Sequence, residues 1–67
     1  MTSKLAARLS REMKKRDMSY AEFAEFLGVP KTQAYDWVQG LHSPNLKSIR
    51  RIAETLECDI ADLIEAA

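Results

Sequence analysis

Residues 19–40, SYAEFAEFLGVPKTQAYDWVQG, constrain the fold of this chain more than any other segment. Ser19 and Glu22 have the spacing of a capping box, in which each side chain binds a free backbone N–H at the start of a helix. The apolar residues that follow end at Gly28, and glycine readily takes the left-handed conformation that closes a helix. Pro30 then breaks the chain, and a second helix can form and end at the glycine that closes the segment. The sequence therefore predicts two short helices joined by a tight turn.

Apolar periodicity predicts three further helices. The first has one apolar stripe with a repeat of four residues and a cap at Thr2 or Ser3. Its stripe consists of Leu5, Leu9 and Met13. A fourth helix can be capped by Ser43 or Asn45, and its expected buried face consists of Leu46, Ile49, Ile52, Ala53 and Leu56. Asp59 can cap a last helix that carries Ile60, Leu63 and Ile64. No segment alternates with a period of two, so we expect an all-α fold, a compact five-helix bundle.

Composition indicates one small globular domain, residues 1–67. The chain is 46% hydrophobic and 30% charged, which is typical of a globular protein. No apolar run is long enough to span a membrane, and the N-terminus lacks the apolar core of a secretory signal. The single cysteine cannot form an internal disulfide. We therefore expect a cytoplasmic protein, in a bacterium or a phage-infected cell, without membrane contact.

The formal net charge is zero, whereas DNA-binding domains usually carry a basic excess. The charges are nevertheless segregated along the chain. Residues 1–16 hold six basic residues against Glu12 alone, and residues 54–67 hold five acidic residues and no basic one. A neutral sum can therefore conceal a basic face and an acidic face.

A tight turn between two short helices is typical of a helix-turn-helix, whose second helix can enter the major groove of DNA. The joint spacing of several motifs resembles the Xre/Cro/phage-repressor-type helix-turn-helix family over residues 8–64. The motifs are L-G-V at 27–29, Gly40, Pro44, I-A-x-x-L at 52–56 and I-x-x-L at 60–63. The resemblance implies a lambda-repressor-like bundle with its helix-turn-helix at about 19–40. It also implies a regulator of transcription that binds operator DNA as a dimer.

Two departures from the family concern its core. Family members often pair an arginine of the first helix with a glutamate two residues before the closing glycine. Here these positions are Met13 and Val38. Because both charges are absent together, no lone buried charge is left, and we expect the fold to survive. Ala34 stands where a larger aliphatic residue is common, and Trp37 can fill the released volume.

The exposed face of the second helix of the motif, residues 31–38, is where base edges would be read. The candidate base contacts are Lys31, Thr32, Gln33, Tyr35 and Asp36. Gln33 can pair with adenine, Lys31 can donate to guanine, and Thr32 can contact a thymine methyl group. The remaining residues, Ala34, Trp37 and Val38, are expected to face the bundle. The alternative for the exposed set is an ordinary solvated helix face.

Phosphate contacts are expected at the starts of the second and fourth helices, where backbone N–H groups favour an anion. The candidate side chains are Ser19, Tyr20, Gln39, Ser43, Asn45 and Lys47. The family often has a glutamine at position 20 that contacts phosphate. A tyrosine hydroxyl can also donate to phosphate, or Tyr20 can simply pack over the helix end.

Several residues have a structural and a functional interpretation. Lys14, Lys15 and Arg16 complement the dipole at the end of the first helix, which is sufficient reason for their charge. Arg50 and Arg51 are interpreted as the solvated face of the fourth helix. Phe26 either belongs to a partner surface or packs inward.

Two functions remain open from the sequence. The first is a sequence-specific DNA-binding transcriptional regulator of bacterial or phage type, repressor-like, that binds double-stranded DNA as a homodimer. The second is a protein-interaction module on the same fold, an antirepressor or an adaptor, with little DNA binding. The zero net charge, Asp36 and Phe26 favour the second. One His and one Cys without a catalytic or metal-binding cluster indicate no enzyme, metal, cofactor or small-molecule ligand.

Overall fold

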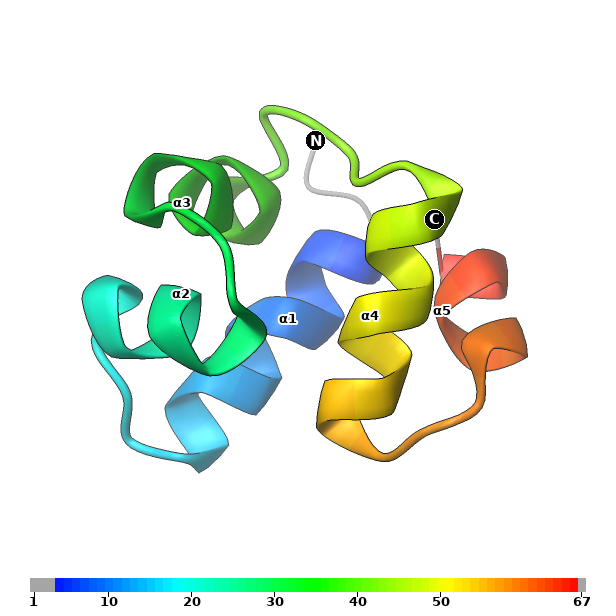
Figure 1. Ribbon diagram of the computed structural model, residues 1–67, viewed down its shortest axis with the longest axis horizontal. Coiled ribbons are helices and arrows are strands. Elements are labelled where there is room, and N and C mark those ends of the chain that lie inside the picture. The colour runs from blue at the N-terminus through cyan, green and yellow to red at the C-terminus, as the bar shows by residue number, and fades with distance from the viewer. Residues whose placement is uncertain (1–3, 67) are drawn as a thin grey trace.

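The chain folds into five α-helices joined by short connections (Figure 1). The computed structural model describes residues 4–66. The helices are α1 (Lys4–Lys15), α2 (Tyr20–Leu27), α3 (Lys31–Gln39), α4 (Leu46–Leu56) and α5 (Ile60–Ala66). The described residues form no β-strand, so the predicted all-α five-helix fold is confirmed. The predicted cap of the first helix, Thr2 or Ser3, lies outside the described residues.

The ends of α2 and α3 are set by local hydrogen bonds and by glycine. The Glu22 backbone N–H donates to Ser19 Oγ at 3.2 Å, and the Ser19 N–H donates to Glu22 Oε1 at 2.9 Å. The predicted capping box is therefore present. Gly28 and Gly40 close the two helices with φ angles of 76° and 77°, in the region that glycine alone occupies without strain.

At the start of α4, Asn45 is the cap. Its Oδ1 accepts a hydrogen bond from the Ser48 N–H at 2.9 Å, which leaves Ser43 as an exposed loop residue. The helix ends at Glu57, which takes a left-handed φ of 56° although it is not a glycine. Both ends of α4 are thus fixed by groups close in sequence.

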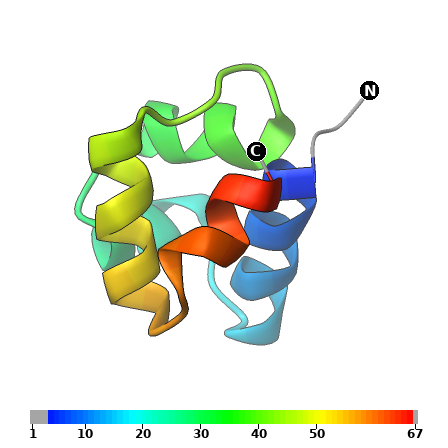
Figure 2. The ribbon, with the colours of Figure 1, turned by 90° about the vertical axis from the view of Figure 1, so that its right-hand side faces the viewer.

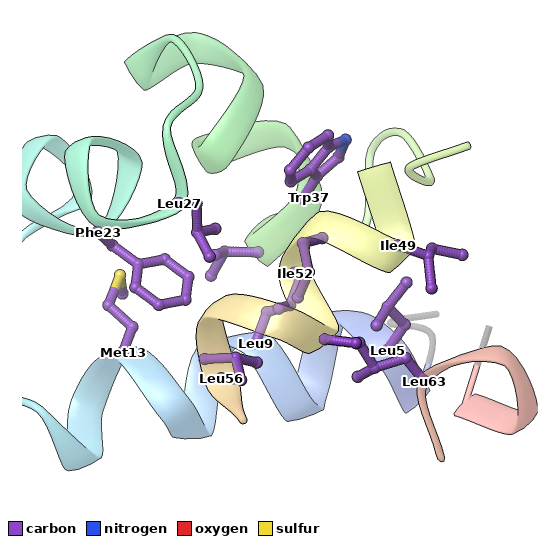
Figure 3. Close-up of a cluster of buried hydrophobic side chains, with 12 residues drawn as sticks. Leu5, Leu9, Met13, Phe23, Leu27, Trp37, Ile49, Ile52, Leu56 and Leu63 are labelled. Atoms are coloured by element: carbon purple, nitrogen blue, oxygen red, sulfur yellow. The ribbon is translucent and has the colours of Figure 1, made fainter. Parts of the chain in front are cut away.

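The core lies where the apolar faces of all five helices meet (Figure 3). The predicted stripe of α1 is buried along its length, and Phe23 of α2 points toward Met13 at one end of it. Trp37 of α3 is 3% exposed and lies over the start of α4. Ala34 and Val38 are also buried, so the predicted inward face of α3 is confirmed. Met13 and Val38, which stand at the positions of the ion pair that the resemblance implies, are both buried apolar residues.

Two apolar residues differ in burial: Leu46 is exposed, whereas Phe26 is half-buried. The prediction that Leu46 belongs to the buried face of α4 is wrong, because its side chain is 53% exposed. The buried face of this helix begins one turn later, at Ile49, and the first turn of α4 lies at the rim of the bundle (Figure 1). Phe26 is half-buried against the core, and the Arg16 guanidinium lies 5.2 Å from the centre of its ring. Phe26 therefore packs inward.

Candidate nucleic-acid interface

The outward face of α3 holds all five of the predicted base-contact residues. Lys31, Thr32, Gln33 and Tyr35 are exposed, and Asp36 is half-buried. The helix begins after Pro30, whose carbonyl accepts hydrogen bonds from the backbone of Gln33 and Ala34 at 3.1 Å each. This turn fixes the direction in which α3 leaves α2. The structure thus presents the five residues together on one side of α3, and their part in reading bases stays a prediction.

Tyr20 is held in place by two residues of α3. The Gln39 Nε2–H donates to the Tyr20 hydroxyl oxygen at 2.6 Å. The ring of Tyr35 lies edge-on to the ring of Tyr20, with 5.0 Å between the ring centres. Since the oxygen of Tyr20 already accepts a hydrogen bond, its own proton is available to donate to an outside acceptor. Tyr20 therefore packs over the end of the motif and still offers a hydroxyl to solvent.

Asp36 has a partner that the sequence did not indicate. The loop after α3 folds back so that the backbone N–H groups of Leu41 and His42 point to the Asp36 carbonyl, at 2.9 and 3.4 Å. This places His42 Nδ1 at 3.2 Å from Asp36 Oδ2. The Asp36 carboxylate on the outward face of α3 is therefore in contact with the loop that follows the helix.

The six predicted phosphate contacts fall into two groups. Ser19, Tyr20 and Gln39 lie together at the start of α2 and the end of α3, and the Tyr20–Gln39 hydrogen bond joins them. The second group is exposed and lies at the start of α4: Ser43 and Asn45 precede the helix, and Lys47 is in its first turn. The structure brings Tyr20 and Gln39 into contact across 19 positions of sequence, and Ser19 adjoins Tyr20 in the chain.

The carboxylate of Glu22 lies beside the first group. The backbone hydrogen bond from Ser19, together with the Ser19 hydroxyl, holds the pKa of Glu22 below its ordinary value. The carboxylate therefore stays ionised at neutral pH and keeps the capping box closed. This box fixes the start of α2, and with it the position of Tyr20, the first residue of that helix.

Arg51 contacts the turn of the motif, which the sequence did not indicate. Its Nη1 donates to the Gly28 carbonyl at 3.3 Å, so the side chain reaches from α4 to the turn of the motif. A groove beside this contact is lined by Gly28, Val29, Pro30, Gln33, Lys47, Ser48 and Arg51. Arg51 and Lys47 thus place two positive charges next to Gln33. Arg51 is exposed, as its interpretation as part of the solvated face of α4 requires, and its contact with a residue 23 positions away could not be read from the sequence.

Neither a membrane segment nor a metal site is found within residues 4–66. No described helix is long and apolar enough to cross a membrane. The described residues also contain no group of three or more His, Cys, Asp and Glu side chains arranged to hold a metal ion.

The tight α2–turn–α3 unit, with α3 presenting polar side chains outward from a five-helix bundle, defines a helix-turn-helix protein. The sequence model of the Cro/C1-type helix-turn-helix DNA-binding domain matches residues 8–67. The chain therefore belongs to this family, which confirms the resemblance seen in its motifs. Comparisons with curated proteins and with solved structures gave no match.

Proposed function

We propose that this chain is a sequence-specific transcriptional regulator of bacterial or phage type, repressor-like, that inserts α3 into the major groove. The exposed first turn of α3 carries this proposal. Within the described residues, Lys31, Thr32 and Gln33 make no side-chain hydrogen bond or ion pair, so their polar groups are free to meet base edges. In such a protein residues 1–67 act as one DNA-binding domain, without catalysis, in the cytoplasm of the host cell.

Base reading would be concentrated at the start of α3. Gln33 can make two hydrogen bonds to adenine, and Lys31 can donate to guanine. Thr32 offers a methyl group to thymine. Tyr35 packs edge-on against Tyr20 and would contact a phosphate or a sugar. Asp36 can accept from cytosine N4, and its Oδ2 already lies 3.2 Å from His42 Nδ1.

Phosphate contacts would flank these base contacts. The Gln39 amide donates to the hydroxyl oxygen of Tyr20. The hydroxyl proton of Tyr20 is therefore available to a phosphate oxygen. On the other side, Lys47 lies at the exposed start of α4 with Arg51 close by. Ser19, Ser43 and the amide of Asn45 add weaker donors. These contacts would set register and affinity, while α3 sets specificity.

A homodimer on DNA is part of this proposal. Three large apolar side chains outside α3 are exposed: Leu41 at 63%, Leu46 at 53% and Ile64 at 48%. Burying such side chains between two copies would favour association. A symmetric dimer would read two half-sites about one helical turn, ~34 Å, apart. Sedimentation with and without a two-half-site duplex tests this, and a one-to-one complex at saturation would contradict it.

The main experiment selects binding sites from a random duplex library and then titrates the selected duplex and a mixed-sequence duplex by fluorescence anisotropy. We expect tight, salt-sensitive binding to the selected duplex and weaker binding to the mixed one. Gln33→Ala should lose about 1–3 kcal/mol of discrimination at one base position. Lys47→Gln, the matched control, should weaken binding to both duplexes alike and lower the salt slope by about 1.

The competing function is the protein-interaction module. The zero net charge, Asp36 and Phe26 favour this module. Of these three features, Phe26 is packed against the core beneath Arg16 and is therefore not a fully exposed partner contact. Absence of binding to mixed-sequence DNA at low salt would reject the regulator. That result would leave the adaptor or antirepressor as the function to test.

A further inference from the structure

Apart from Lys4, which is exposed at the start of α1, the basic residues of the first helix and its end divide into two groups. Three of them surround Glu12, which is only 6% exposed. Their nitrogens lie 3.9 Å (Arg8), 4.0 Å (Lys15) and 3.1 Å (Arg16) from its carboxylate oxygens. Arg11 and Lys14 are exposed on another face of α1 and make no ion pair within residues 4–66. These two positive charges are therefore not needed to hold the bundle together.

Arg11 and Lys14 line a groove between α1 and the last turn of α3. The other lining residues are Ala7, Ser10, Val38 and Gln39. None of them is acidic, so the groove has a net positive charge. Val38, which is buried, lines the groove from α3. An anion can thus approach α1 at this place without meeting a carboxylate of the lining.

This groove is continuous with the outward surface of the motif. Gln39 is one of its lining residues, and the same side chain donates to the Tyr20 hydroxyl. Tyr20 is a phosphate contact in the proposed function. A sugar-phosphate strand that passes Tyr20 would therefore reach Arg11 and Lys14 next.

The groove also lies across α3 from the other basic pair. Figure 2 shows α3 above the bundle, with α4 on one side and α1 on the opposite side. Lys47 and Arg51 lie at the α4 side, beside Gln33 near the start of α3. Arg11 and Lys14 lie at the α1 side, beside Gln39 at its end. A nine-residue helix is about 13 Å long, and the major groove is about 12 Å wide between its two bordering strands.

We propose that Arg11 and Lys14 form a second phosphate-binding edge, so that the two strands bordering the major groove are held from opposite sides of α3. This inference rests on the proposed function and adds residues of α1 to it. It also explains how a chain with no net charge can bind DNA. The acidic residues of the last two helices lie outside both lined grooves that flank α3, so the positive charge is concentrated where phosphates would pass.

The test compares two double variants that remove the same amount of charge. R11Q/K14Q neutralises the proposed edge. The matched control, K15Q/R50Q, removes Lys15 from the Glu12 cluster and Arg50 from α4, where Arg50 lines a groove with Glu54 and Asp59. Both variants and the parent are titrated with the selected and the mixed-sequence duplex between 50 and 200 mM salt. Circular dichroism and thermal unfolding confirm that all three proteins are folded.

For R11Q/K14Q we expect the slope of log affinity against log salt to become shallower by about 1.8, or 0.9 for each lost phosphate contact. The loss of affinity over this fourfold salt range then shrinks by about tenfold relative to the parent. Binding to both duplexes should weaken by the same factor, because phosphate contacts carry no sequence information. The control should keep a slope within about 0.5 of the parental value.

Equal salt slopes for R11Q/K14Q and K15Q/R50Q would overturn the inference. The effect on DNA binding would then come from the net charge of the protein and not from phosphate contacts of Arg11 and Lys14. A changed base preference in R11Q/K14Q would overturn it as well. Both outcomes leave the proposed function intact, because the parent still binds DNA. If the parent itself fails to bind at 50 mM salt, the proposed function is rejected, and the second edge is rejected with it.

Discussion

The Glu12→Gln variant removes a carboxylate shared by three cations and keeps the shape and helix propensity of the side chain. The hydrogen bond from Arg16 is 3.1 Å long, and a hydrogen bond to a charged group contributes about 1.5–3 kcal/mol. The longer pairs with Arg8 and Lys15 are partly exposed to solvent and contribute at most about 1 kcal/mol each. We expect the free energy of unfolding to fall by about 2–3 kcal/mol at pH 7. In a domain of this size each kcal/mol lowers Tm by about 4–8 °C.

The pH dependence identifies the cause of this loss. Burial raises the pKa of Glu12, but the hydrogen bond and charge of Arg16 and the charges of Lys15 and Arg8 outweigh burial, so the pKa lies below its ordinary value of 4.5. A carboxyl with a lowered folded-state pKa stabilises the protein above the unfolded-state pKa. That stabilisation is lost as the pH falls through the folded-state pKa. Glutamine resembles neutral glutamic acid, so the difference between parent and variant should be full at pH 7 and shrink below about pH 4.5.

Urea unfolding followed by the fluorescence of Trp37, the single tryptophan, measures this difference at pH 7, 5 and 3. Glu25→Gln is the matched control, because Glu25 is exposed and makes no ion pair within the described residues. It should leave stability unchanged at every pH. A Glu12→Gln loss as large at pH 3 as at pH 7 would refute the reasoning, because it would trace the loss to packing. No loss at pH 7 would refute it too.

Two further predictions concern the turn and the outward face of α3. Gly28→Ala should lower the free energy of unfolding by about 1–2 kcal/mol, the cost of a left-handed conformation for an L-residue. The added Cβ would meet only Arg51 Nη1, at 3.8 Å, which is an ordinary contact, so the cost comes from the backbone conformation. Asparagine takes the left-handed conformation more readily than alanine, so Gly28→Asn should cost less. Thermal unfolding of both variants checks this. Asp36→Asn should raise affinity for mixed-sequence DNA by up to about fivefold, because one charge repulsion of about 1 kcal/mol is removed. Anisotropy titration measures the affinity. Unchanged or weaker binding would count against the proposal that α3 lies in the major groove, close to the phosphates on either side.

Features set by neighbours in sequence could be predicted well. The capping box of Ser19 and Glu22, the closing glycines and the inward face of α3 are confirmed, because each depends on helical periodicity or on groups three or four residues apart. Leu46 shows the limit of this reasoning. Periodicity predicts that it lies on the apolar face of α4, but burial of that face begins one turn later, at Ile49.

Charges were the least predictable part of the candidate site. The spacing of Arg8, Lys15 and Arg16 around Glu12 could have indicated their cluster, since residues three and four apart meet on a helix. No local signal could have indicated that His42 lies beside Asp36, or that Arg51 reaches Gly28. Such contacts depend on how a loop folds back and on how two helices cross.

By itself, the sequence determined five helices, where the motif helices begin and end, and which side of α3 faces outward, because these properties follow from the backbone and its near neighbours. Only the tertiary structure decided which polar groups are already engaged. It joined Tyr20 to Gln39, enclosed Glu12 with three cations, and placed Arg11 and Lys14 beside the end of α3, without an ion pair to any described residue. Those pairings depend on the packing of α1, α2 and α4 against α3. Helical periodicity fixes the face of a residue but not the residue that it meets across an interface between helices.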